Sequence, residues 1–496
     1  MDETEATPMG VIPELVPNFI DGEEVPAASG ARFDNINPHD GSVLSEVASS
    51  NAEDVNRAVA AAKAAQEAWA DLTPVARGDI LREAALAIRD RRDEIAEIVA
   101  LETGKSISEA RGETMGAFEL GMFMAGEGRR YFGRTSTSAN PHREVLIVRQ
   151  PVGVCGLIIA ANTPIANVAW KAFPALMCGN GAVMKAADDT PATGWIVAKI
   201  FHEAGVPAGV FNMIHGSGPE AGQPLVEHED VDLVSFTGSA AVGRMIQRVA
   251  GERLAKVILE LGGKNPLVVC DDADLDNAAD AVVLSAFSNA GQRCASGSRI
   301  IAFDSVYEEL RQRVIERAES LELGNTNDDD LGPVINERQL SNMLSAIDRA
   351  VANGARVTTG GHRLEDADHV GGFYLAPTLI EDAEPADPIS RDELFGPITC
   401  LYRVGGFDEA LELANDSLFG LTAAIHTKNL HRAMRFANKM RTGLVSINGF
   451  TYGSEPHMPF GGLKQSGNGL REPGPEALDV YSAQKNVLIQ TDPSAV

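Results

Sequence analysis

Five short apolar segments constrain the fold of this chain more than any other feature of its sequence. They cover residues 152–159, 182–185, 209–214, 233–236 and 257–259, and helix-like segments separate them. Strands without polar positions are typical of a parallel sheet that helices cover on both faces. The alternation of strands and helices therefore predicts a doubly wound α/β domain.

A second series of strands follows Lys264, beginning with residues 267–269 and including residues 443–447. A chain of 496 residues exceeds one ordinary domain, and 44% apolar residues are ample for more than one core. We therefore predict a second α/β domain after the first.

Charge and composition exclude several classes of protein. The formal net charge of −28 would repel the phosphate backbone of a nucleic acid. No run of about eighteen apolar residues occurs, and the first residues lack the basic-then-apolar pattern of a secretory signal. We therefore expect a cytoplasmic protein that binds neither nucleic acid nor a membrane. The excess of acidic residues is typical of a saline cytoplasm or of a source with a biased composition.

One cysteine and one glutamate form a candidate catalytic pair. The 5 cysteines include no CxxC pair and the 10 histidines no HExxH motif, so we expect reduced thiols and no metal. Gly291 and Gly297 bracket Cys294 and allow a close backbone approach. Glu260 follows the apolar run 257–259, which places it at the end of a buried strand. A thiol nucleophile needs a base and backbone donors nearby, although a buried cysteine and a surface glutamate are the alternative.

The segments Glu260-Leu-Gly-Gly-Lys264 and Gly291-Gln-Arg-Cys294 resemble those of the aldehyde dehydrogenase superfamily. The resemblance extends from residue 19 to residue 489. It implies that Cys294 attacks the aldehyde, that the Asn162 amide and a backbone N–H stabilise the oxyanion, and that Glu260 activates the hydrolytic water. The implied reaction is NAD(P)-dependent oxidation of an aldehyde to a carboxylic acid through a thiohemiacetal and a thioester.

The resemblance also implies a division of the chain. Residues 15–134 and 151–262 would form the NAD-binding domain, and residues 263–464 the catalytic domain. Residues 135–150 and 476–496 would form a small β arm that bridges subunits of a homodimer or homotetramer. An ordinary surface hairpin is the alternative for residues 135–150.

Several segments match cofactor-binding elements of the family. Phe236-Thr-Gly-Ser239 joins a strand to a helix, where free N–H groups attract a phosphate, although such a turn is a weak signal alone. Lys185 and Asp188 resemble the pair that binds the adenosine ribose. Because a carboxylate there repels a 2′-phosphate, we favour NAD and leave NADP open. Glu393 and Phe395 match the residues that hold the nicotinamide riboside. The resemblance further implies Ile158, Ile159, Gly218, Thr237, Gly238, Val242, Leu261 and Gly262 as cofactor residues.

The substrate is less constrained than the chemistry. The implied pocket residues are Asn167, Trp170, Arg293, Phe450, Tyr452 and His457. Two arginines expected in the succinate-semialdehyde branch are replaced by Trp170 and Ser288, which weakens that assignment. Arg293 could hold an anionic aldehyde or turn away into the structure, and the aromatic residues leave aromatic aldehydes open.

Two other functions compete with this one. A CoA-acylating aldehyde dehydrogenase is disfavoured because that branch of the family generally lacks the counterpart of Glu260. A non-catalytic nucleotide-binding or structural protein on the same fold is disfavoured by the intact set of Glu260, Cys294 and Asn162.

Overall fold

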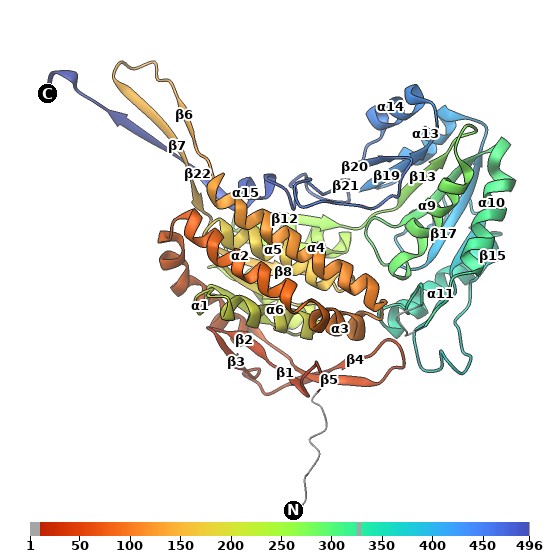
Figure 1. The fold of residues 1–496 in the computed structure, drawn as a ribbon, viewed down its shortest axis with the longest axis horizontal. Helices are drawn as coiled ribbons and strands as arrows, with labels where there is room; N and C mark the ends of the chain where they lie inside the picture. Colours follow the sequence, from red (N-terminus) through yellow and green to blue (C-terminus); the bar gives the residue numbers. More distant parts are fainter. Residues whose placement is uncertain (1–9, 325–328, 496) are drawn as a thin grey trace, which may run out of the picture.

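The computed structural model describes residues 10–324 and 329–495, which fold around two seven-stranded sheets (Figure 1). The first sheet has the order β12-β11-β8-β9-β10-β2-β3, in which the first five strands are parallel and the last two antiparallel. Its strands are β2 (Asn18–Ile20), β3 (Glu23–Val25), β8 (Val154–Ile158), β9 (Gly181–Lys185), β10 (Phe211–Ile214), β11 (Leu233–Gly238) and β12 (Lys256–Leu261). The strand order reverses beside β8, which confirms the predicted doubly wound domain.

Helices cover both faces of this sheet. One face carries α5 and α6, with α2, α3 and α4 packed outside them, and the other carries α1, α7 and α8. The bounds are α1 (Ala52–Asp71), α2 (Pro74–Asp90), α3 (Arg92–Thr103), α4 (Ile107–Gly126), α5 (Pro164–Met177), α6 (Pro191–Glu203), α7 (Gln223–Glu227) and α8 (Ala240–Glu252). A small sheet of β1 (Leu15–Val16), β4 (Arg32–Ile36) and β5 (Val43–Ala48) lies at the N-terminal end of the described chain.

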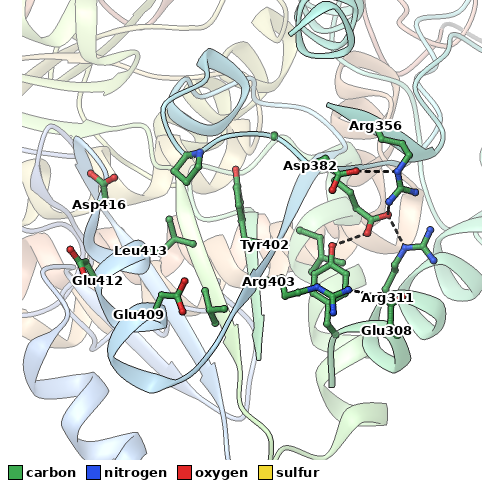
Figure 2. Close-up of a pocket in the computed structure, with 16 residues that line it drawn as sticks. Glu308, Arg311, Arg356, Asp382, Tyr402, Arg403, Glu409, Glu412, Leu413 and Asp416 are labelled. Carbon is green, nitrogen blue, oxygen red and sulfur yellow. Dashed lines mark hydrogen bonds and ion pairs between the residues drawn. The ribbon is translucent and has the colours of Figure 1, made fainter. Parts of the chain in front are cut away.

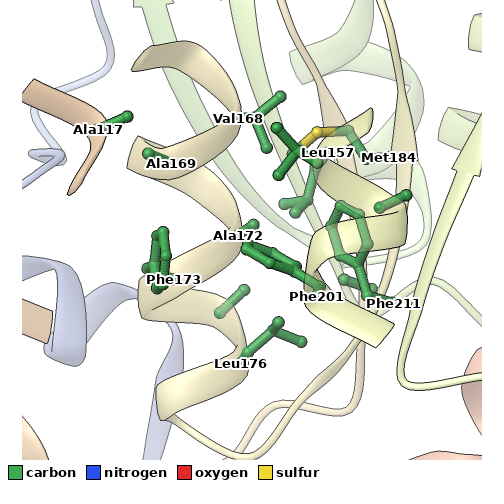
Figure 3. Close-up of a cluster of buried hydrophobic side chains, with 14 of the residues drawn as sticks. Ala117, Leu157, Val168, Ala169, Ala172, Phe173, Leu176, Met184, Phe201 and Phe211 are labelled. Carbon is green, nitrogen blue, oxygen red and sulfur yellow. The ribbon is translucent and has the colours of Figure 1, made fainter. Parts of the chain in front are cut away.

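Aromatic and small residues hold α5 between the sheet and α4 (Figure 3). The ring of Phe173 meets that of Phe201 edge-on at 5.2 Å, and Phe201 meets Phe211 at 5.0 Å. On the outer side, Gly121 of α4 leaves room for Phe173, because a Cβ at position 121 would lie 2.6 Å from that ring. The close packing brings α4 beside the start of α5, where Asn162 lies.

Local signals place the helix ends. Thr73 caps α2 and accepts a hydrogen bond from the Ala76 amide at 3.2 Å, and Gly104 ends α3 with a φ of 76°. The pattern Ser50-x-x-Glu53 predicts Ser50 as the cap of α1, and this is wrong. Asn51 caps the helix, because the Ser50 hydroxyl is buried and donates to Asn18 instead.

The second sheet has the order β15-β16-β17-β14-β13-β19-β20 and is parallel except for β15. Its strands are β13 (Asn265–Val269), β14 (Gly297–Phe303), β15 (Arg356–Thr359), β16 (Thr378–Glu381), β17 (Ile398–Val404), β19 (Thr422–His426) and β20 (Leu444–Ile447). One face packs against α9 (Leu275–Phe287) and α10 (Asp304–Glu319), and the other against α11 (Glu337–Ala352), α13 (Phe407–Asn415) and α14 (Leu430–Lys439). The predicted second α/β unit is confirmed.

A three-stranded arm projects from the body of the molecule (Figure 1). It consists of β6 (Arg134–Ser136), β7 (Arg143–Pro151) and β22 (Ser482–Gln490), with β7 in the centre and antiparallel to both neighbours. Leu488 and Ile489 are exposed on its outer strand. Further short elements include α12 (Pro388–Arg391), β18 (Phe419–Gly420), β21 (Leu463–Lys464) and α15 (Glu476–Val480). No helix within the described ranges is long and apolar enough to cross a membrane.

Candidate active site

A cavity of about 420 Å³ lies between α4, the start of α5 and the loop that precedes β14. Cys294 and Asn162 both line it. The structure therefore brings together the predicted nucleophile and the predicted oxyanion donor, which are far apart in the sequence.

The backbone before Cys294 adopts an unusual conformation. Asn289, Ala290 and Gly291 have φ angles of 53°, 50° and 66°, so three consecutive residues lie in the left-handed region. Only glycine fits at position 291, because a Cβ there would collide with the Gly396 carbonyl. After the cysteine, the Asn265 amide donates to the carbonyl oxygens of Cys294 at 2.8 Å and Ser296 at 2.9 Å. The loop thus fixes the position of a half-buried thiol.

The Cys294 thiol is a weak acid in this setting. Burial raises its pKa to about 12, and the negative charges of Glu393 and Glu260 act in the same direction. Arg293 and the Ala295 amide lower the pKa but do not outweigh these effects. The thiol is therefore protonated near neutral pH, and attack on a carbonyl requires that its proton be removed.

A hydrogen bond to the loop before Cys294 holds the side-chain amide of Asn162. Its Nδ2 donates to the Gln292 carbonyl at 2.9 Å. An amide nitrogen carries two hydrogens, so one remains for an oxyanion in the cavity. Its backbone carbonyl accepts hydrogen bonds from Lys105 Nζ at 2.8 Å and Asn289 Nδ2 at 3.2 Å.

Glu260 occupies the end of β12, which confirms that it ends a buried strand. Neither of its carboxylate oxygens has a hydrogen-bond partner among the described residues. Burial raises its pKa well above the ordinary value, Glu472 adds to the rise, and Lys171 and Arg471 oppose it. Glu260 does not line the 420 Å³ cavity, but its charge acts on the Cys294 thiol.

A buried ionic network adjoins Glu260. Lys171 Nζ donates to the Glu472 carboxylate at 2.9 Å and to the Ser235 hydroxyl at 2.6 Å. Tyr481 donates to the same carboxylate. The sequence analysis missed these residues, because they come from distant parts of the chain and no local motif joins them.

The predicted cofactor residues gather where the order of the first sheet reverses. Ile158 ends β8 and Ile159 follows it, Lys185 ends β9, and Phe236, Thr237 and Gly238 end β11. Ser239 caps α8 and accepts a hydrogen bond from the Val242 amide at 3.4 Å. Asp188 forms an ion pair with Lys185, and the space beyond Gly218 is open. Strand ends and a helix N-terminus at a switch point fit the pyrophosphate and ribose of a dinucleotide.

Glu393 packs against the backbone that follows Glu260. Its carboxylate accepts a hydrogen bond from the Gly263 amide at 2.8 Å, and a Cβ at Gly262 would collide with it. Burial raises the pKa of Glu393 to about 7, while the Gly263 amide and Lys264 oppose the rise. Phe395 follows with a φ of 59°, and Leu261 packs on Gly243 of α8. Glu393 is therefore fixed beside the segment that carries Glu260.

Three of the six predicted substrate residues line the cavity, namely Trp170, Arg293 and Tyr452. Asn167 does not, because its amide is buried and donates to the carbonyls of residues 160 and 163. Phe450 lies outside and stacks on Tyr452, with ring centroids 5.5 Å apart. His457 is exposed and also lies outside the lining.

One wall of the cavity was missed by the sequence analysis. Glu109, Gly112, Glu113 and Gly116 of α4 line it, together with Lys105. The repeat of charged and small residues at i, i+3 and i+4 along residues 109–116 is a signal that places them on one helix face.

A larger cavity of about 830 Å³ lies beside β16 and β17 and holds none of the predicted site residues (Figure 2). Its arginines are paired with carboxylates: Arg311 with Glu381, Arg356 with Asp382, and Arg403 with Glu308. Because Cys294 and Asn162 line the smaller cavity and neither lines the larger one, we assign the active site to the smaller cavity.

Comparison with known proteins agrees with this geometry. The family model of the aldehyde dehydrogenase family matches residues 25–487. The chain is 40% identical over 476 residues to the alpha-ketoglutaric semialdehyde dehydrogenase of Bacillus subtilis, covering 95% of this chain and 98% of that protein. It is 38% identical over 472 residues to the alpha-ketoglutarate semialdehyde dehydrogenase of Haloferax volcanii, with the same two coverages.

Solved structures give the same result. Betaine aldehyde dehydrogenase from Staphylococcus aureus, crystallised with NAD⁺, superposes with a TM-score of 0.94 at 37% identity, covering 96% of this chain and 95% of that one. The chain belongs to the aldehyde dehydrogenase family. It is an oxidoreductase that oxidises an aldehyde to a carboxylic acid with NAD(P), by a mechanism that uses a cysteine.

Proposed function

We propose that this enzyme oxidises a short aldehyde that carries a carboxylate, with Cys294 as nucleophile, Asn162 as oxyanion donor and Glu260 as base. The observation that carries the proposal is that Cys294, Asn162 and Arg293 line one cavity. The two relatives named as semialdehyde dehydrogenases of alpha-ketoglutarate support the anionic substrate.

Each residue has a defined task in this mechanism. The Cys294 thiol first loses its proton to solvent water, and the thiolate then attacks the carbonyl carbon. The free Asn162 N–H with a backbone N–H binds the oxygen as it becomes negative. The residues at the strand ends would hold NAD, which would supply the hydride acceptor for the oxidation. Glu260 then takes a proton from the water that releases the acid from Cys294.

Arg293 is the cation placed to recognise the substrate's far end. Its guanidinium lies over the Tyr452 ring at 4.9 Å and contacts Glu109 at 3.2 Å. Its Nε has no hydrogen-bond partner among the described residues. Trp170 and Phe460, with ring centroids 5.3 Å apart, supply the apolar surface for the carbon chain. A guanidinium next to the nucleophile attracts a carboxylate and repels a cationic aldehyde.

A panel of aldehydes tests the proposal. NADH formation is measured for aldehydes of equal length that end in a carboxylate, a methyl group or a trimethylammonium group, with and without CoA. We expect the highest kcat/KM for the carboxylate, with no need for CoA. Arg293→Met should raise KM for the carboxylate about tenfold or more and leave the methyl compound almost unchanged. Preference for the cationic aldehyde, or a requirement for CoA, would contradict the proposal.

We further propose that the arm joins subunits of a homodimer or homotetramer. Among the described strands, its outer strand β22 pairs along one edge only, and it exposes apolar residues, which supports pairing with another copy. Residues 15–134 with 151–262 would bind the cofactor, and residues 263–464 would carry the nucleophile. The five free thiols support a cytoplasmic location. Deletion of residues 136–148 should lower the mass measured by light scattering, and an unchanged mass would contradict the bridging role.

A further inference from the structure

Two carboxylates on one face of α4 contact the two loops that carry the reacting groups. Glu109 and Glu113 lie four residues apart, about one helical turn, and both line the active-site cavity. Glu109 contacts the loop that leads to Cys294, and Glu113 contacts the start of α5 beside Asn162. The mechanism above assigns no role to either residue.

The contact at Asn162 runs through a buried ion pair. Lys105 Nζ lies 2.5 Å from Glu113 Oε2, and the two side chains are only 3% and 7% exposed. The same ammonium donates to the backbone carbonyl of Asn162 at 2.8 Å, and Glu113 Oε1 accepts from the Ala166 amide at 3.2 Å. The pair therefore holds the oxyanion residue at its own carbonyl and the helix that follows it at its first turn.

The contact at the nucleophile loop is made by Glu109. Its Oε1 accepts hydrogen bonds from the Asn289 amide at 3.1 Å and from Arg293 Nη2 at 3.2 Å. Asn289 is one of the three residues with positive φ, so this bond holds the loop where its backbone is least favourable. The two loops are also tied to each other, by Asn162 Nδ2 to the Gln292 carbonyl and by Asn289 Nδ2 to the Asn162 carbonyl.

We propose that Lys105 and Glu113 are positioning residues that hold the Asn162 amide at the oxyanion site. Glu109 holds the loop before Cys294 in place opposite that amide. This inference rests on the proposed role of Asn162 as oxyanion donor. An oxyanion donor acts only when its N–H is aimed at the position that the oxyanion will occupy. Because Lys105 binds the backbone of Asn162 itself, its loss would allow the amide to move away from that position.

A double-mutant cycle between Lys105 and Asn162 tests the proposal. The rate constant of the first-turnover NADH burst is measured for Lys105→Met, Asn162→Ala and the double variant. We expect Lys105→Met to slow the burst about tenfold, a fraction of the 10²–10³ that one oxyanion donor is worth. In the Asn162→Ala background the same change should have an effect of less than about twofold, because nothing remains to be positioned. A merely structural role would give the same loss in both backgrounds.

Arg111→Met is the matched control. Arg111 lies on α4, the helix that carries Glu113, and forms an ion pair with Asp93 of α3 at 2.9 Å, but it does not line the cavity. Its burst rate should equal that of the parent enzyme. If Lys105→Met fails to fold because Glu113 is left as an unpaired buried charge, the Lys105→Met/Glu113→Gln variant removes both charges and takes its place in the cycle.

The outcomes separate this inference from the proposed function. Equal losses in the two backgrounds, or an unchanged burst in the Lys105 variants beside a slow Asn162→Ala, would overturn the positioning role alone. A normal burst in Asn162→Ala would overturn the oxyanion assignment and the positioning role with it. Retained dissociation constants for NAD in all variants exclude a general collapse of the site.

Discussion

Asn162 and Glu260, the two groups proposed to act at the Cys294 thiol, differ in the number of hydrogen bonds that hold them. On one side, Asn162 is fixed through its side chain by Gln292 and through its carbonyl by Lys105 and Asn289. On the other side, the Glu260 carboxylate is buried and has no hydrogen-bond partner among the described residues. The Asn162 amide is therefore held by several hydrogen bonds, whereas the Glu260 carboxylate is held by none among the described residues.

This difference fits the role that we propose for each group. An oxyanion donor keeps the same protonation state throughout the reaction, and its effect depends on fixed geometry. A general base has to bind and release a proton, so hydrogen bonds that stabilise its ionised form would lower its pKa and its basicity. Leaving a carboxylate buried without partners costs stability, and such costs are typical of functional sites.

The largest effect is expected at the thiol that both sides share. Cys294→Ala removes the nucleophile but none of the groups predicted to bind the cofactor, so turnover should fall below detection while NAD binding persists. Steady-state NADH formation and NAD titration check the two parts. Cys270→Ala, at a buried thiol directly after β13, should retain activity. Turnover in Cys294→Ala would remove this residue from the mechanism.

The next largest effect is expected at Glu260, the carboxylate without a hydrogen-bond partner among the described residues. Glu260→Gln keeps the size of the side chain but removes its basic lone pair, so steady-state turnover should fall by about 10²–10⁴-fold. The first NADH burst should remain at about one equivalent per site, since the change also removes a charge that raises the pKa of Cys294. Stopped-flow absorbance checks the burst, and hydroxylamine should speed the slow phase by taking the acyl group. Loss of the burst would instead make Glu260 the base that ionises the thiol.

Most of the fold could be predicted from the sequence, because parallel strands buried on both faces leave short runs that are mostly apolar. The strands β8 to β12 all coincide with such runs. The cap of α1 was misplaced by one residue, since Ser50 and Asn51 both suit a cap and only the tertiary contact of Ser50 with Asn18 decides between them. Tertiary contacts override local signals wherever two neighbours have similar propensities.

The candidate site was predicted where a motif is continuous in the chain. Glu260 and Cys294 each stand in such a motif, and the structure places Cys294 and Asn162 in one cavity, which Glu260 does not line. The α4 wall and the network of Lys171 and Glu472 were missed, because these residues meet only after distant segments pack together. Of the predicted pocket residues, Asn167 does not line the cavity, because its amide donates to backbone carbonyls near the start of its own helix.

The pH dependence of deacylation should distinguish the role of Glu260 further from that of Asn162. In the proposed mechanism Glu260 is the base, and burial places its pKa above the ordinary value for a carboxyl group. Because the ionised form is the base, the deacylation rate should rise about tenfold per pH unit below this pKa and level off above it. Single-turnover measurements on the acyl-enzyme check this, and the rising limb should vanish in Glu260→Gln. A rising limb that survives the substitution would belong to another group.

The smallest effect is expected at a carboxylate that, unlike Glu260, is paired and half exposed. Asp188 contacts Lys185, and 47% of its side chain is accessible. Asp188→Ser removes the charge that would repel a 2′-phosphate and frees the Lys185 ammonium to meet one. An exposed ion pair is worth at most about 1 kcal/mol, so the ratio of kcat/KM for NADP to that for NAD should rise only about fivefold.

Asp230→Ser, at the exposed pair of Asp230 with Lys63, is the matched control and should leave the ratio unchanged. An unchanged ratio in Asp188→Ser would place Asp188 away from the ribose, whereas a rise of several hundredfold would show that its charge acts with little screening, as that of buried Glu260 does.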